Sequence, residues 1–139
     1  MAGSRTYPAA FQRTDFESDE LGVIGLDGAL ELLNGYDWGA LALEFERATD
    51  EHGADSVCPP TLWLGEDLDP MLGLTTLERE AAQVVLDYRR EVNVLGLFRF
   101  KMGKNVCEMV SHKDLPEVVR RFFAVDDGDF SKILDGLKR

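Results

Sequence analysis

Cysteine and histidine are scarce in this chain of 139 residues, which has two of each: Cys58, Cys107, His52 and His112. A disulfide framework needs several cysteines, and a structural zinc site shows ligands in close pairs along the sequence. Neither pattern is present. We therefore expect reduced thiols, and neither a metal ion nor any other cofactor.

Long apolar runs are also missing. A helix that crosses a membrane needs about eighteen or more consecutive apolar residues, and a secretory signal needs a shorter apolar core near the amino terminus. The first twelve residues, MAGSRTYPAAFQ, do not contain such a core, and no later stretch reaches the length of a membrane span. These observations predict a cytoplasmic protein without a membrane partner.

Phosphate-binding motifs fail on spacing. In GLFRFKMGKN, residues 96–105, six residues separate the two glycines where a phosphate loop has four, and Asn105 follows Lys104 where that loop has Ser or Thr. The glycines of LGVIGLDG, residues 21–28, depart from a dinucleotide fingerprint in the same way, and Asp27 would repel a pyrophosphate. Both stretches are expected to be structural.

Positive charge is nearly absent from the first half of the chain. Residues 1–70 hold fifteen acidic residues and three arginines, a formal charge of −12, whereas residues 71–139 hold twelve basic and eleven acidic residues, a charge of +1. Such a field repels nucleic acid and attracts cationic surfaces. The charge predicts a basic protein partner and no nucleic acid, although acidic residues also serve plain solubility.

The composition is that of a folded protein. Hydrophobic residues make up 45% of the chain and charged residues 29%, and the length suits one domain. Residues 1–20 mix Gly, Ser, Pro and charge without steady periodicity, which indicates a loose N-terminal arm. Residues 21–139 are expected to form a single α+β domain.

Apolar spacing predicts two helices in the acidic half. Residues 26–34 repeat apolar side chains every three or four positions, and residues 37–53 do the same between Asp37 as N-cap and Gly53 as terminator. Short strands are expected at 21–25 and at 61–65, the second directly after two prolines.

Capping pairs predict further helices in the second half. Thr75 with Glu78 indicates a helix to about Arg90, and Asp114 with Glu117 indicates another one. The second helix carries a thick apolar stripe that ends in Phe122 and Phe123. A last short helix is expected around residues 130–137.

Two β-rich runs, residues 92–102 and 105–111, predict a hairpin around Gly103 and Lys104. Depending on the loop, Phe100 faces either Cys107 or Met109, and the sequence leaves both registers open. The order of elements predicts an α+β fold: a small, mostly antiparallel sheet of about three strands, including the 92–111 hairpin, covered by four to five helices.

The charge distribution favours a non-enzymatic acidic module that binds a cationic protein, either as an immunity-type inhibitor or in a chaperone-like role. Tyr36 and Trp38 are candidate aromatic anchors, with core packing an equally good explanation of Trp38. The residues expected to bind the partner lie on or beside the two acidic helices: Glu31, Tyr36, Asp37, Glu44, Glu46, Asp50 and Glu51.

The alternative is a small cytosolic enzyme or ligand-binding domain in which Cys107 and His112 supply the chemistry. A straight strand places these two residues on opposite faces, so that pairing requires a bend near Ser111. A homodimer through the stripe at Phe122 and Phe123 is compatible with either function.

Overall fold

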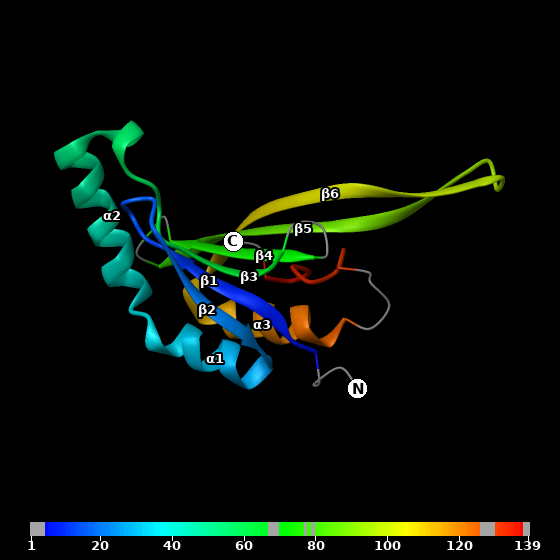
Figure 1. The fold of residues 1–139 in the computed structure, drawn as a ribbon, viewed down its shortest axis with the longest axis horizontal. Coiled ribbons are helices and arrows are strands. Elements are labelled where there is room, and N and C mark those ends of the chain that lie inside the picture. The colour runs from blue at the N-terminus through cyan, green and yellow to red at the C-terminus, as the bar shows by residue number, and fades with distance from the viewer. Residues whose placement is uncertain (1–4, 67–69, 77, 79, 126–129, 138–139) are drawn as a thin grey trace.

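The computed structural model describes residues 5–66, 70–76, 78, 80–125 and 130–137, with the backbone alone at 90–92 and 100–101. In these residues six strands form one antiparallel sheet in the order β2-β1-β3-β4-β5-β6, accompanied by three α-helices (Figure 1). The elements are β1 Tyr7–Gln12, β2 Ser18–Ile24, α1 Leu26–Gly35, α2 Trp38–His52, β3 Thr61–Gly65, β4 Met71–Thr76, β5 Ala81–Val94, β6 Phe98–Ser111 and α3 Leu115–Ala124.

The α+β class is confirmed, but the expected number of elements is wrong. The sheet has six strands in the described residues where about three were expected, and the α-helices number three where four or five were expected. Strand β1 comes from the segment expected to be an arm and most of β5 from the segment expected to be a helix, whereas β2 overlaps the strand expected at 21–25. Strand β3 lies where the sequence placed it, at residues 61–65.

The helix expected over residues 75–90 is wrong, because β4 ends at Thr76 and β5 begins at Ala81. Apolar side chains at 81, 84, 85 and 88 satisfy a helical period, but those at 82, 84, 86 and 88 satisfy a period of two, and these are the ones buried in the core. The Thr75 hydroxyl lies 2.9 Å from the Thr61 hydroxyl on the neighbouring strand instead of capping a helix.

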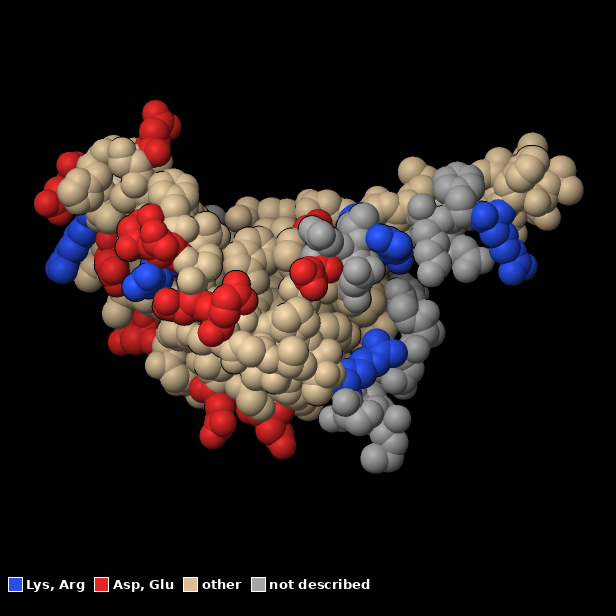
Figure 2. Space-filling model, viewed as in Figure 1, with Lys and Arg blue, Asp and Glu red and all other residues tan. Residues whose placement is uncertain are grey.

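The second-half hairpin is present, but its turn lies at residues 95–97, not at Gly103 and Lys104. Leu95 and Gly96 have φ angles of 56° and 71°, the left-handed conformation of a tight turn. Both expected registers are wrong, since Phe100 pairs with Val92 and Cys107 with Val85. The strands run far past the rest of the sheet and project from the molecule (Figure 1 and Figure 2).

The loose arm expected over residues 1–20 is wrong where the structure describes it, because Tyr7–Gln12 and Ser18–Ile24 are strands. Strand β1 lies inside the sheet between β2 and β3, and its alternate side chains Tyr7, Ala9 and Phe11 are buried. These two strands are short, and prolines, serines and charged residues surround them, so the alternation of apolar and polar side chains is difficult to recognise in the sequence.

The core lies between one face of the sheet and the helices. Leu62, Leu64, Leu72 and Leu74 come from the two middle strands and have no exposed surface. On α3, Phe122 and Phe123 are also buried, with the Phe122 ring 4.7 Å from the ring of Tyr7. The aromatic stripe therefore packs inside its own chain, against the core face of the sheet.

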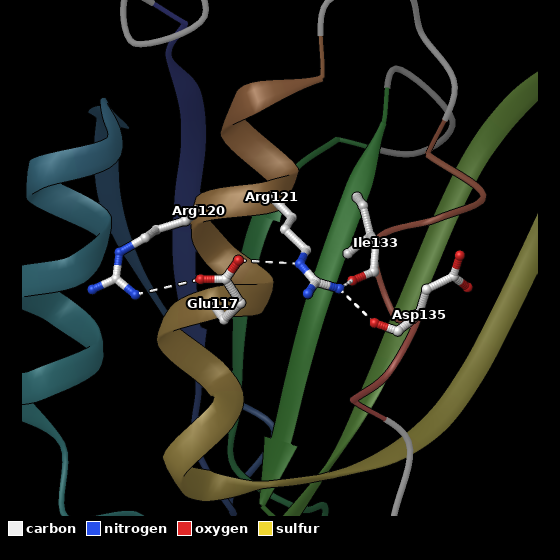
Figure 3. Close-up of polar contacts among 5 residues, drawn as sticks. All are labelled: Glu117, Arg120, Arg121, Ile133 and Asp135. Carbon is white, nitrogen blue, oxygen red and sulfur yellow. Dashed lines mark hydrogen bonds and ion pairs between the residues drawn. The ribbon is translucent and has the colours of Figure 1, made fainter.

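The C-terminal segment is held against α3 by one arginine (Figure 3). Arg121 donates from Nη1 to the carbonyl oxygens of Ile133 and Asp135, at 3.0 and 2.7 Å, and from Nε to Oε1 of Glu117 at 3.1 Å. The segment consists of turns where a helix was expected, yet it buries Phe130, Ile133 and Leu134 as the pattern indicated.

The helices in the described part of the chain are too short or too polar to cross a membrane.

Candidate protein-binding surface

Helices α1 and α2 form where the sequence places them. Asp37 is the N-cap of α2, and its Oδ1 accepts a hydrogen bond from the Ala40 amide at 3.1 Å. The helix ends at Gly53, whose φ of 87° suits glycine and whose amide donates to the Thr49 carbonyl oxygen at 2.8 Å. Asp37 therefore has a structural role beside any role in binding.

The inner side of α2 begins with Trp38, which belongs to the core. Its Nε1 donates to the Leu33 carbonyl oxygen at 2.9 Å, and its own carbonyl oxygen accepts from the Thr76 hydroxyl at 2.9 Å. Trp38 is buried, so core packing accounts for it fully. This side chain orients the start of α2 against α1 and against strand β4.

Tyr36 lies between the two helices and is partly buried. Its ring stacks on Phe11, with centroids 4.4 Å apart and an interplanar angle of 14°, and meets Trp38 edge-on. Burial raises the pKa of the Tyr36 hydroxyl, and the carboxylate of Asp19 raises it further. Tyr36 thus presents a neutral hydroxyl beside the acidic helices at neutral pH.

The exposed part of α2 carries four carboxylates and one arginine. Glu44, Glu46, Asp50 and Glu51 are all exposed on α2, with the exposed Arg47 between them, and Glu31 is exposed on α1. Figure 2 shows acidic side chains in the majority over this part of the molecule, with a few basic side chains among them, and further basic side chains toward the projecting hairpin. The acidic residues therefore outnumber the basic ones over the helices, although the two signs of charge are not fully separated.

These carboxylates are not neutralised by the basic residues of the second half. Within the described residues, no lysine or arginine comes within ion-pair distance of the five; the one pairing found is between Glu51 and His52, at 3.9 Å. The cations of α3, Arg120 and Arg121, instead contact Glu117. Among the described residues, an incoming cationic surface would meet carboxylates that have no lysine or arginine partner.

Two shallow grooves lie within this acidic region. The first, about 450 Å³ in volume, runs along α2 and is lined by Ala40, Leu43, Glu44, Arg47, Ala48, Glu51 and His52. The second, about 480 Å³, lies between β2 and α1 and is lined by Leu21, Ile24, Gly28, Glu31, Leu32, Gly35 and Tyr36. We call them the α2 groove and the β2–α1 groove; each combines carboxylates with apolar surface.

Cys107 and His112 are not brought together. Cys107 is exposed on β6, where its Sγ accepts a hydrogen bond from Nε2 of Gln83 at 2.8 Å. The His112 ring lies on the other, helix-covered face, 6.4 Å from the ring of Trp38. Because β6 continues without interruption to Ser111, the bend required for a Cys–His pair does not form.

A row of residues across the opposite face of the sheet was missed in the sequence. Cross-strand pairing aligns Ala10, Trp63, Gly73, Val85 and Cys107 on the face away from the core. The indole of Trp63 lies over Gly73 and donates from Nε1 to Oε1 of Gln12 at 3.4 Å. The sequence could have indicated this row only if β4 and β5 had been predicted as strands, because the row depends on how these strands pair with their neighbours.

Comparisons with known proteins identify no relative: the chain matches no protein-family model, no curated protein and no solved structure. Nor do three or more His, Cys, Asp or Glu side chains in the described residues come close enough together to hold a metal ion. Function is therefore argued from the arrangement of charge and shape.

Proposed function

We propose that this chain is a non-enzymatic protein-binding module that docks a cationic protein on the acidic surface of α1 and α2. The observation that carries the proposal is the set of exposed carboxylates at Glu31, Glu44, Glu46, Asp50 and Glu51, which have no lysine or arginine partner among the described residues. Folding stability does not require such an arrangement, because like charges on one helix repel one another.

Electrostatic complementarity acts mainly on the rate and selectivity of association. A surface of one sign steers an oppositely charged partner during diffusion and excludes partners of like charge. Affinity requires apolar contact in addition, and the two grooves supply it through residues such as Leu43 in the α2 groove and Leu32 in the β2–α1 groove. Carboxylates and apolar surface thus occur together on one surface.

The partner class that fits best is a basic protein whose own function is to bind an anion. An enzyme that acts on nucleic acid has a cationic active site, and an acidic protein that covers this site would inhibit it, as an immunity-type inhibitor does. A chaperone-like role toward a basic protein is the second version. The two versions differ in whether the bound partner is inactive or merely held soluble.

The test begins with recovery of a basic partner by co-purification with the native chain, followed by kinetics on the two purified proteins. The double variant E44K/E46K reverses two exposed carboxylates on α2. We expect its association rate constant to fall by about tenfold or more at low salt, with a weaker dependence on ionic strength. Stopped-flow fluorescence over a salt series measures both quantities.

A matched control separates this surface from net charge. The double variant E80K/D135K makes the same change in charge at two exposed positions outside α1 and α2. At about 0.15 M salt its association rate should stay within about twofold of the native rate, because the rate effects of distant exposed charges are largely screened beyond a Debye length of about 8 Å. If E44K/E46K associates as fast as this control, the acidic helices are not the docking surface.

A further inference from the structure

The β5–β6 hairpin extends beyond the sheet that supports it. Strand β4 pairs with β5 as far as Asp87, so residues 88–94 and 98–104 form a ribbon of two strands only. At about 3.3 Å per residue this ribbon is roughly 20 Å long. Figure 1 shows it projecting from the rest of the molecule. We call residues 88–104 the hairpin extension.

The tip of the hairpin extension is apolar and open to solvent. Leu95 is 87% exposed, Leu97 78% and Phe98 65%, and Val94 and Met102 are also exposed. An isolated two-stranded ribbon is marginal in water, and clustered exposed apolar side chains mark contact sites. The extension has the composition of a segment that is completed by binding.

The charge of the hairpin extension is opposite to that of the rest of the chain. It holds five basic residues and one acidic residue, a charge of +4, which leaves ten basic and twenty-five acidic residues, or −15, elsewhere. Arg89, Arg99 and Lys104 are exposed along it. Its partner must therefore offer apolar contact within a negatively charged surface.

The β2–α1 groove meets this requirement on the chain itself. Leu21, Ile24 and Leu32 give it an apolar lining, Glu31 supplies a carboxylate, and its volume is about 480 Å³. On the hairpin extension, the apolar side chains of Leu97 and Phe98 precede the cationic Arg99. This arrangement complements the apolar lining and the single carboxylate of the groove. The groove lies on β2 and α1 and the extension on β5 and β6, so the extension of one copy can reach the groove of a second copy.

We propose that the hairpin extension of one copy of this chain docks in the β2–α1 groove of a second copy. Leu97 and Phe98 enter the groove, and Arg99 faces the Glu31 carboxylate. Each copy has one extension and one groove, so a reciprocal exchange closes a symmetric dimer. The dimer would occupy Glu31 and the β2–α1 groove, which also belong to the proposed docking surface, so its test measures self-association of the purified chain without a partner.

Sedimentation velocity of the purified chain over a wide concentration range, at low and at high salt, tests the proposal. We expect self-association that weakens with added salt. L97D at the tip should raise the dissociation constant at least about tenfold, since a charge would enter an apolar groove. R99E and E31R should each weaken association, and the double variant R99E/E31R should recover most of it by restoring opposite charges.

Controls keep the outcome interpretable. K132E and E80R repeat the two charge reversals at exposed positions outside the extension and the groove, and both should self-associate as the native chain does. Circular dichroism and thermal melting confirm the fold of every variant. A native chain that stays monomeric at all concentrations overturns the proposal, as does association that L97D leaves unchanged or that R99E/E31R fails to restore.

A separate arm asks whether the apolar tip binds lipid instead. Vesicles of anionic phospholipid are co-sedimented with the native chain and with L97D. Binding that requires Leu97, from a chain that is monomeric in solution, would assign the tip to a lipid surface and overturn the dimer. Failure here leaves the kinetics of E44K/E46K untouched, so the two proposals stand or fall separately.

Discussion

Gly73 is a residue whose smallness the fold requires. It lies in the middle of β4, and a Cβ atom there would stand 2.4 Å from Cζ3 of Trp63, well inside contact distance. We expect Gly73→Ala to lower the free energy of unfolding by about 1–3 kcal/mol, because the indole must leave its position over the strand. Chemical denaturation followed by circular dichroism measures the change.

A second substitution checks the cause. Trp63→Leu in the Gly73→Ala background relieves the clash, so the loss in the double variant should be smaller than the sum of the two single losses. Strictly additive losses would show that Trp63 is not the group that Gly73 accommodates. The sequence alone could not have indicated this pair, because it depends on the register of β3 with β4.

Tyr36 gives a prediction on pH dependence. Its pKa is raised above the ordinary value of 10.0, first by burial and then by the Asp19 carboxylate. A raised folded-state pKa contributes stability that is fully present below the unfolded pKa of about 10 and is lost as the pH rises through the folded-state value. We therefore expect the chain to lose stability above pH 10 as Tyr36 ionises.

Phenolate absorbance during an alkaline titration follows this group. Tyr36→Phe should remove a late-titrating phenol, and Asp19→Asn should move the Tyr36 pKa part of the way back toward 10, because burial, the larger cause, stays in place. A titration in which Tyr36→Phe shows as many phenols ionising above pH 10 as the native chain would contradict this assignment.

At the scale of elements, the two acidic helices could be predicted and β5 could not. Helices α1 and α2 have one apolar side and clear end signals in Asp37 and Gly53, so that local sequence determines them. In β5 the buried series Ala82, Val84, Leu86 and Tyr88 is accompanied by Val85 on the other face. A strand apolar on both faces cannot be told from a helix by periodicity, and tertiary pairing decides.

Arg121 offers a prediction on the C-terminal segment. Arg121→Ala removes the donors to the carbonyl oxygens of Ile133 and Asp135, and hydrogen bonds from a charged group are worth about 1.5–3 kcal/mol each. Because the Arg121 side chain is about one-third exposed and its bond to Asp135 lies at the surface, the expected loss of stability is toward the lower end of that range. Hydrogen exchange of the amides at 130–137 should become faster, since the segment loses its attachment to α3.

Arg120→Ala is the matched control. Its nearest ion pair, Nη1 to Oε2 of Glu117, spans 3.7 Å at the surface, and such pairs contribute about 0–1 kcal/mol. The amides at 130–137 should keep native exchange rates in this variant. Equal acceleration in both variants would mean that loss of charge on α3, and not the Arg121 hydrogen bonds, loosens the segment.

At the scale of the whole molecule, the sequence alone shows that charge is unevenly distributed along the chain, but it does not show on which element the positive charge is concentrated. The contrast of −12 and +1 between the halves is visible by counting. The contrast of −15 and +4 between the body and the hairpin extension required the correct turn, which lies at Gly96 and not at Gly103. Once β5 and β6 have their full length, the basic residues between Arg89 and Lys104 occupy one projecting element.

A trade-off between stability and association should follow from the acidic surface. Glu46 and Asp50 are one helical turn apart on the exposed side of α2, and like charges at this spacing are destabilising by about 0.2–0.5 kcal/mol. Glu46→Lys replaces that repulsion with an attraction and also reduces the net charge. We expect a small rise in melting temperature at low salt that disappears at high salt.

The same Glu46→Lys variant should associate more slowly with its cationic partner, because it removes a charge that steers the encounter. Surfaces that serve binding commonly carry such a conflict, whereas carboxylates that serve only solubility would give the gain in stability with no loss in association rate. Melting curves and stopped-flow kinetics on the one variant, with E80K as the control of equal charge, therefore decide between the two explanations of this acidic surface.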